Sequence, residues 1–310
     1  PVDDLLPDLA ARRVLKSLDR PLDDTVPVRR PITLRDLLTF RFGLGAVMAF
    51  PARHPIQKAM EAAGVAPGPF GPTLTADQYM ARLGELPLIH QPGERWLYHT
   101  GSDVLGILLA RAADRPLADV LQERLFGPLG MKDTGFCVPA GKLARLACAY
   151  RHDAAAGGLV CLDRGKDGRW SQSPVFESGG GGLVSTADDC LAFWCMMLDR
   201  GRHDGRRLLA RPTVEAMTAD QLLPSQNDGA ELFFGDSKGW GFGFGVTVRR
   251  TDPWETPGRF GWDGGLGTSA YADPQEGLVG VLLTQRMMES PRPPRAFTDF
   301  WSGAYQAIDD

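Results

Sequence analysis

The hydrophobic pattern changes period along this chain, and that change constrains the fold more than any other feature of the sequence. Apolar residues at helical spacing dominate from about residue 30 to residue 130. The last third instead alternates apolar and polar residues, as in 241–250, or forms a short apolar run, as in 278–284. Strands with short connections pair antiparallel. We therefore expect an α+β fold of the α/β sandwich type, with an antiparallel sheet flanked by helices and a mainly helical lobe.

The 310 residues are predicted to form one domain with two lobes. We expect the helical lobe over about residues 25–175. The sheet lobe is expected over about residues 176–310, closed by a C-terminal helix over 296–308. A groove between two such lobes is the default place for a functional site.

Capping residues locate individual helices within the helical region. Thr33, followed three residues later by Asp36, predicts a helix start, and a second short helix is predicted over 75–83. Ser102 is predicted to cap a further helix. Four apolar residues are expected on the inner face of that helix: Val104, Leu105, Leu108 and Leu109.

Charge and apolar runs limit the partners that this chain could have. Lys and Arg number 34 against 38 Asp and Glu, a formal charge of -4, which argues against a nucleic-acid binder. Apolar stretches such as 104–110 fall far short of the ~20 residues that a membrane-spanning helix needs. We expect a small-molecule partner, no nucleic acid and no membrane span, and the oligomeric state stays open.

Cysteine and histidine spacing gives no sign of a metal or redox centre. The five cysteines are Cys137, Cys148, Cys161, Cys190 and Cys195, and no pair has C-x-x-C spacing. Their irregular spacing fits reduced thiols and favours the cytoplasm, although the compartment stays open. No Walker A loop is present, and no cofactor is predicted. G-x-S-x-G is absent too, so an α/β-hydrolase nucleophile elbow is not supported.

Four ordered segments together resemble one family. Residues 32–45 resemble its I-T-x-R-D-L-L-T-x-x-x-G-x-G segment, and residues 92–102 resemble its P-G-x-x-W-x-Y-x-[NT]-x-[GS] segment. Residues 180–189 resemble G-G-G-L-x-S-T-A-x-D, and Trp262 to Gly264 resemble its third motif, [KHW]-x-G. The family is the serine β-lactamase and penicillin-binding-protein superfamily. The most similar branch is the class C β-lactamase-like serine hydrolases, which include the family VIII esterases.

This resemblance implies a β-lactamase/transpeptidase-like fold and acyl transfer through a serine, with an acyl-enzyme that water then hydrolyses. Tyr98 matches the tyrosine that shuttles the proton in the family; a free phenol has a pKa of about 10 and needs a nearby cation to act as a base. The backbone N–H of Gly265 matches an oxyanion donor of the family. Thr100, Trp262 and Gly264 are the expected substrate-binding residues.

The sequence departs from the family at the nucleophile, which the family carries in a Ser-x-x-Lys motif. No serine stands three residues before any lysine, and the lysines are Lys16, Lys58, Lys132, Lys142, Lys166 and Lys238. Residues 1–9 fit the family segment that follows this motif. We therefore expect an N-terminal truncation that removes the nucleophile and the first elements of the fold, and an inactive chain as printed.

A second departure concerns the substrate. Family members that bind β-lactams or peptides usually place a cation in the third motif, whereas this chain has Trp262, whose indole is only an N–H donor. Family VIII esterases carry the same replacement, so a neutral ester or amide is the expected substrate, and a β-lactam stays open.

Other interpretations stay open beside the enzyme. A ligand-binding or sensor protein on the same fold would also lack the nucleophile, and an unrelated binding module would match the motifs by chance. Thr100 could equally close a turn. His99 is predicted at a pocket edge or on the surface, and Ser178 has no lysine or histidine at a diagnostic spacing. Asp263 is expected to point outward.

Overall fold

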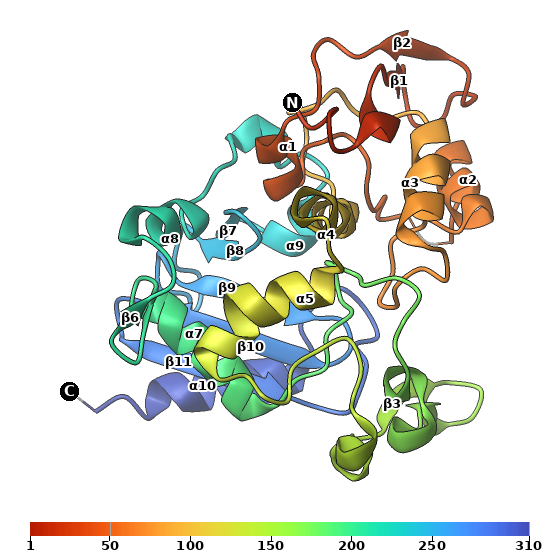
Figure 1. Ribbon diagram of the computed structural model, residues 1–310. Helices are drawn as coiled ribbons and strands as arrows, with labels where there is room; N and C mark the ends of the chain where they lie inside the picture. Colours follow the sequence, from red (N-terminus) through yellow and green to blue (C-terminus); the bar gives the residue numbers. More distant parts are fainter. Residues whose placement is uncertain (50, 310) are drawn as a thin grey trace. The chain divides into compact units, whose positions relative to one another are not determined.

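The computed structural model describes residues 1–49 and 51–309, which form two compact units (Figure 1). Unit 1 combines Pro1–Val120, Val175–Gly182 and Leu222–Ala230. Unit 2 combines Leu121–Pro174, Leu183–Gln221 and Glu231–Asp310. The segments of the two units alternate along the chain, whereas the two lobes expected from the sequence, 25–175 and 176–310, are contiguous.

Unit 1 is mainly helical, and Figure 1 shows α2 and α3 side by side. Its helices are α1 (Leu34–Leu38), α2 (Pro55–Ala63), α3 (Ala76–Glu85), α4 (Thr100–Ala113) and α5 (Leu117–Leu121), whose last residue belongs to unit 2. Short 3-10 turns lie at Pro7–Leu9 and Pro224–Gln226, and β1 (Arg13–Leu15) pairs antiparallel with β2 (Thr25–Pro27).

Reciprocal caps explain where two of these helices begin. The Thr33 side chain accepts from the backbone N–H of Asp36, whose carboxylate accepts from the Thr33 N–H, so two helix-end amides are satisfied at the start of α1. Thr75 and Gln78 make the same pair of bonds at α3. Both starts are as predicted from the sequence.

The start of α4 differs from the prediction. Ser102 lies inside the helix, which begins at Thr100 with His99 at the N-cap position. The buried face of α4 runs through Val104, Ile107 and Leu108 at helical spacing. Leu109 is 44% exposed, because it is rotated about 100° away from that face, so its assignment to the core was wrong.

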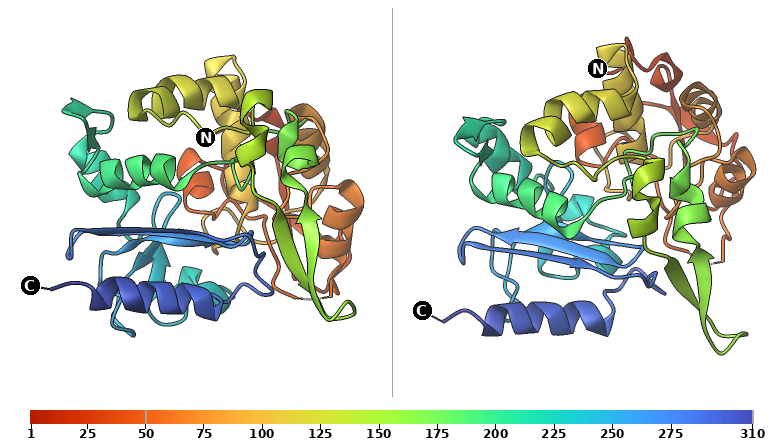
Figure 2. Two further views of the ribbon diagram at one scale, coloured as in Figure 1. Left: turned by 90° about the horizontal axis from the view of Figure 1, so that it is seen from below. Right: turned by 60° about the horizontal axis from the view of Figure 1, so that its bottom comes forward.

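Unit 2 contains the main sheet, with the antiparallel strand order β11-β10-β9-β8-β7. The strands are β7 (Lys238–Trp240), β8 (Gly245–Thr247), β9 (Phe260–Gly264), β10 (Thr268–Asp273) and β11 (Leu278–Leu283). Figure 2 shows the sheet nearly edge-on, with α7 (Ala187–Leu198) on one face and α10 (Arg295–Gln306) on the other. The α+β architecture predicted from the sequence is thereby confirmed.

Alternation along the strands divides the side chains between the two helices. Phe260 and Ala272, paired between β9 and β10, lie in a core cluster with Met196 and Met197 of α7. Tyr271 points to the other face, where its ring meets Trp301 of α10 edge-on at 5.4 Å. Each face of the sheet is thus buried by one helix.

One strand prediction was wrong. The run 241–250 is not a single strand, because residues 241–244 turn the chain from β7 into β8. The Gly241 N–H donates to the Phe244 carbonyl at 2.8 Å, and Gly243 has φ +90°. Glycine adopts that backbone conformation without a steric cost.

The rest of unit 2 is made of shorter elements. Its helices are a π-helical stretch (Gln122–Phe126), α6 (Gly127–Leu129), α8 (Arg211–Met217) and α9 (Glu231–Phe234). Its small hairpins pair β3 (Ala149–Asp153) with β4 (Gly158–Asp163) and β5 (Arg202–His203) with β6 (Arg206–Arg207). Within the described residues, no helix combines the length and apolarity needed to cross a membrane.

Candidate functional site

Tyr98 is held through its backbone by the segment that follows α1. The Leu97 N–H donates to the Phe40 carbonyl at 2.8 Å, and the Ala46 N–H donates to the Tyr98 carbonyl at 3.0 Å. A Cβ on Gly45 would lie 2.8 Å from the Leu97 and Tyr98 carbonyl oxygens, so only glycine allows this close approach. The first and second motif segments are therefore one structural unit around Tyr98.

The Tyr98 ring lies in an aromatic cluster and is half-buried. It stacks on Trp96 with ring centroids 5.7 Å apart, and it lies 6.2 Å from the ring of Phe40. Rings at these separations attract one another beyond the area that they bury. The cluster restricts where the phenol can point.

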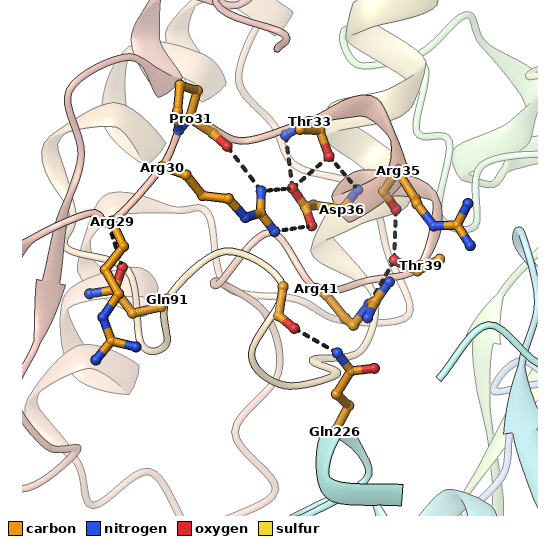
Figure 3. Close-up of polar contacts among 11 residues, drawn as sticks. Arg29, Arg30, Pro31, Thr33, Arg35, Asp36, Thr39, Arg41, Gln91 and Gln226 are labelled. Carbon is orange, nitrogen blue, oxygen red and sulfur yellow. Dashed lines mark hydrogen bonds and ion pairs between the residues drawn. The ribbon is translucent and has the colours of Figure 1, made fainter. Parts of the chain in front are cut away.

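Polar contacts hold the two motif segments in place (Figure 3). Arg30 donates to both carboxylate oxygens of Asp36, at 2.6 and 2.8 Å. Burial raises the pKa of Asp36, but hydrogen bonds from Arg30 and Thr33 outweigh it and lower the pKa below its ordinary value. Gln226 donates to the Gly93 carbonyl at 2.8 Å, which ties the second motif to the loop 222–230.

Thr100 is fully buried at the first position of α4. Its hydroxyl has no hydrogen-bond partner within the described part of the chain. Its backbone N–H donates to the Tyr98 carbonyl at 3.2 Å. Thr100 is thus bonded to the backbone of Tyr98, and its side chain is shielded from solvent. Its role in substrate binding stays a prediction.

The other expected site residues lie in unit 2, at the end of β9. Trp262 is half-buried; it stacks on Phe233 at 6.0 Å and meets Trp240 edge-on at 5.0 Å. Gly264 is crowded, because a Cβ there would lie 2.3 Å from the Thr268 hydroxyl. Gly265 is exposed, and a Cβ there would meet no atom within 4 Å. A substrate could approach the backbone of Gly265 without displacing a side chain.

A buried relay supports this end of β9. Ser269 donates to Asp263 at 2.6 Å and accepts from the indole N–H of Trp301 at 2.9 Å. The guanidinium of Arg259 lies over the Tyr271 and Trp301 rings, at 3.8 and 4.2 Å. Asp263, which was expected to point outward, is therefore half-buried and bonded to its neighbour strand.

The expected site residues thus form two groups, one in each unit. Tyr98 and Thr100 adjoin one another in unit 1, and Trp262, Gly264 and Gly265 adjoin one another in unit 2. That both groups face one cleft stays a prediction. Within residues 1–49 and 51–309, no three His, Cys, Asp or Glu side chains are grouped to hold a metal ion.

One buried carboxylate next to His99 was not predicted from the sequence. Asp103 is 2% exposed and accepts from Ser178 Oγ at 2.6 Å and from the Gly180 N–H at 3.1 Å. Its Oδ2 lies 3.4 Å from Nε2 of His99. The four-residue spacing of His99, at the N-cap position, and Asp103, in the first turn of α4, was a signal for this pair in the sequence.

Comparisons with known proteins agree on one family. A family model described as Beta-lactamase matches residues 5–299. Protein Rv1367c of Mycobacterium tuberculosis (strain ATCC 25618 / H37Rv) is 37% identical over 301 residues, which cover 92% of this chain and 70% of the relative. Esterase EstB of Burkholderia gladioli is 30% identical over 315 residues, covering 92% of this chain and 75% of the esterase.

Solved structures show the same likeness. The structure of EstCE1, a hydrolase with promiscuous acyltransferase activity, matches with a TM-score of 0.75 and 26% identity. The match covers 98% of this chain and 77% of EstCE1.

Proposed function

The chain belongs to the β-lactamase family, and from that membership we propose that it supplies the base and one oxyanion donor of a serine hydrolase that forms an acyl-enzyme. The observation that carries the proposal is the placement of Tyr98. Its backbone is fixed by the first motif segment, its ring lies in an aromatic cluster, and the residue as a whole is half-buried. A catalytic base must be held in this way to reach a proton at hydrogen-bond distance.

Each residue then has a role in the reaction. Tyr98, as the base, takes the proton of the nucleophilic serine as the serine attacks the ester carbonyl, and returns it to the leaving alcohol. The Gly265 N–H stabilises the negative oxygen of the tetrahedral intermediate, an effect that typically contributes ~10²–10³ in rate. Water, activated in the same manner, hydrolyses the acyl-enzyme.

The substrate proposed is a neutral ester. Trp262, packed between Phe233 and Trp240, offers an aromatic wall in place of the cation that would hold a carboxylate. The relatives support this choice, since EstB is an esterase and EstCE1 a hydrolase with acyltransferase activity. An acceptor alcohol in place of water would make the same acyl-enzyme an acyl donor.

A ligand-binding homologue without turnover is the second candidate. The observation that favours it is the lack of a Ser-x-x-Lys pair within the 310 residues, which also predicts that these residues alone are inactive. The sequence of the complete open reading frame discriminates between the two, because a frame without Ser-x-x-Lys would support the ligand-binding protein.

The test of the enzyme is a Tyr98→Phe change in the protein translated from the complete open reading frame. With p-nitrophenyl butyrate as the substrate, we expect kcat to fall ~10²–10⁴-fold, the range for losing a general base. Tyr305→Phe, on α10, is the matched control for loss of a phenol hydroxyl and is expected to retain turnover. Unchanged turnover in Tyr98→Phe would contradict the proposal.

A further inference from the structure

The residue after Tyr98 has a strained backbone. His99 has φ 81° and ψ -68°, and the Thr100 N–H donates to the Tyr98 carbonyl across it at 3.2 Å. These values describe a γ-turn with a positive φ, which is rare and strained for a residue with a side chain. Such a conformation persists only where the surrounding structure enforces it, and it is common beside functional groups.

Asp103 contacts both this turn and the loop that follows residue 177. Its buried Oδ1 accepts from Ser178 Oγ at 2.6 Å and from the Gly180 N–H at 3.1 Å. Its Oδ2 faces His99 Nε2 at 3.4 Å. A single carboxylate thus joins the γ-turn on one side to the glycine-rich loop, residues 178–182, on the other.

At Gly179 and Gly180 the glycine-rich loop packs closely against α4 and the imidazole of His99. A Cβ on Gly179 would lie 2.2 Å from the Ser102 carbonyl oxygen. A Cβ on Gly180 would lie 3.2 Å from both Cε1 and Nε2 of His99. The His99 ring therefore lies against both the loop and Asp103, and it also meets the Tyr98 ring edge-on at 5.8 Å.

We infer that Asp103 is a positioning residue for Tyr98. It holds the glycine-rich loop and the His99 ring in one arrangement, and this arrangement keeps the γ-turn that sets the direction of the Tyr98 side chain. Ser178, which has no lysine or histidine at a diagnostic spacing for a nucleophile, donates a hydrogen bond to Asp103. The inference rests on the proposed function, because it gives Asp103 an effect on turnover only through Tyr98.

A first test uses the 310-residue chain and needs no activity. In Asp103→Ala, amide hydrogen exchange is expected to rise about tenfold or more at Gly180, whose N–H loses one of its two acceptors and keeps only Ser178 Oγ. Exchange is expected to rise also at Thr100, whose acceptor is in the γ-turn. Asp119→Ala, at an exposed position on the next helix, is the control and should leave both rates unchanged. Faster exchange at Gly180 with an unchanged rate at Thr100 would overturn the coupling.

The second test is a double-mutant cycle in the protein translated from the complete open reading frame. Asp103→Ala is expected to lower kcat for p-nitrophenyl butyrate about tenfold to hundredfold, the scale of a misplaced catalytic group, with KM changed by less than about threefold. Added to Tyr98→Phe, the same change should lower kcat no further. If Asp103→Ala does not fold, Ser178→Ala can replace it, because it removes the hydrogen bond from Ser178 to Asp103. This variant should also lower kcat, by a smaller factor, and should lower it no further in the Tyr98→Phe background.

The outcomes separate this inference from the function on which it rests. An unchanged kcat in Asp103→Ala, or an equal loss in the Tyr98→Phe background, overturns the positioning role and leaves Tyr98 as the base. An unchanged kcat in Tyr98→Phe overturns the proposed function and this inference with it.

Discussion

Arg30 and Asp36 form a two-point ion pair at the start of α1, with Nη1 to Oδ2 at 2.6 Å and Nη2 to Oδ1 at 2.8 Å. The Asp36 side chain is only 4% exposed and also completes the cap with Thr33. Asp36→Ala is therefore expected to lower the free energy of unfolding by about 1–3 kcal/mol, measured by urea denaturation. Glu215→Ala, which breaks the exposed Arg211 pair, is the control and should cost no more than about 0.5 kcal/mol.

The same residue predicts a dependence of stability on pH. The pKa of Asp36 is lowered in the folded chain, so its contribution is present above the unfolded value of about 4 and is lost as the pH falls through the folded value. The difference in unfolding free energy between the wild type and Asp36→Asn should shrink as the pH drops from about 5 toward ~2. A difference that stays constant over that range would show that the charge of Asp36 contributes nothing.

Ser269 joins Trp301 of α10 to Asp263 of β9, and its removal tests the relay. Ser269→Ala leaves a buried indole N–H without its acceptor, which is expected to cost about 1–3 kcal/mol of unfolding free energy. Ser302→Ala on α10 removes only a local bond to the Thr298 carbonyl and should change stability by about 0.5 kcal/mol or less. Equal losses of unfolding free energy in the two variants would mean that the hydrogen bonds of Ser269 to Trp301 and Asp263 stabilise the fold no more than a local bond does.

Gly45 tests the backbone support of Tyr98. The Cβ of Gly45→Ala would lie 2.8 Å from the Tyr98 carbonyl oxygen, so the segment that carries Tyr98 must shift. We expect kcat of the complete protein to fall about tenfold to hundredfold, because small misplacements of a catalytic group are costly. Gly68→Ala meets no atom within 4 Å and is the matched control. Loss of activity in both variants would point to general damage instead of misplacement.

Trp262 predicts the charge of the preferred substrate. A neutral p-nitrophenyl ester should have a higher kcat/KM than the same ester with a carboxylate on its acyl group, since an indole offers no cation. Trp262→Lys is expected to shift that ratio toward the carboxylate substrate by about tenfold to hundredfold, the scale of one hydrogen bond to a charged group. An unchanged ratio would show that Trp262 does not contact the acyl group.

Local sequence patterns predicted helix starts well, because a single capping residue determines where such a helix begins. Thr33 and Thr75 mark helix starts because capping is a contact within four residues. The alternation over 241–250 wrongly predicted one strand, because the pattern does not show that Gly243 has a positive φ and that the chain turns there. Leu109 was placed in the core because a stripe of four leucine and valine positions is wider than the face that α4 buries.

The candidate site was predictable only in part, for a related reason. Motif order identifies Tyr98 and Trp262 but not the groups that support them. Asp103 and Ser178 are far apart in sequence, and nothing local shows that one buried carboxylate joins them. The strain at His99 is likewise imposed by tertiary contacts and has no sequence signature.

The central claim, acyl transfer assisted by Tyr98, is tested most directly by trapping the acyl-enzyme. The protein translated from the complete open reading frame is mixed with p-nitrophenyl butyrate and quenched in acid. It is then digested, and the masses of its peptides are measured by mass spectrometry. We predict a burst of p-nitrophenol and a butyryl group on a serine of a Ser-x-x-Lys motif, with both lost in Tyr98→Phe, while the 310-residue chain alone gives neither. A complete protein with no acylated serine, or a 310-residue chain whose turnover is abolished by Tyr98→Phe, would contradict the account.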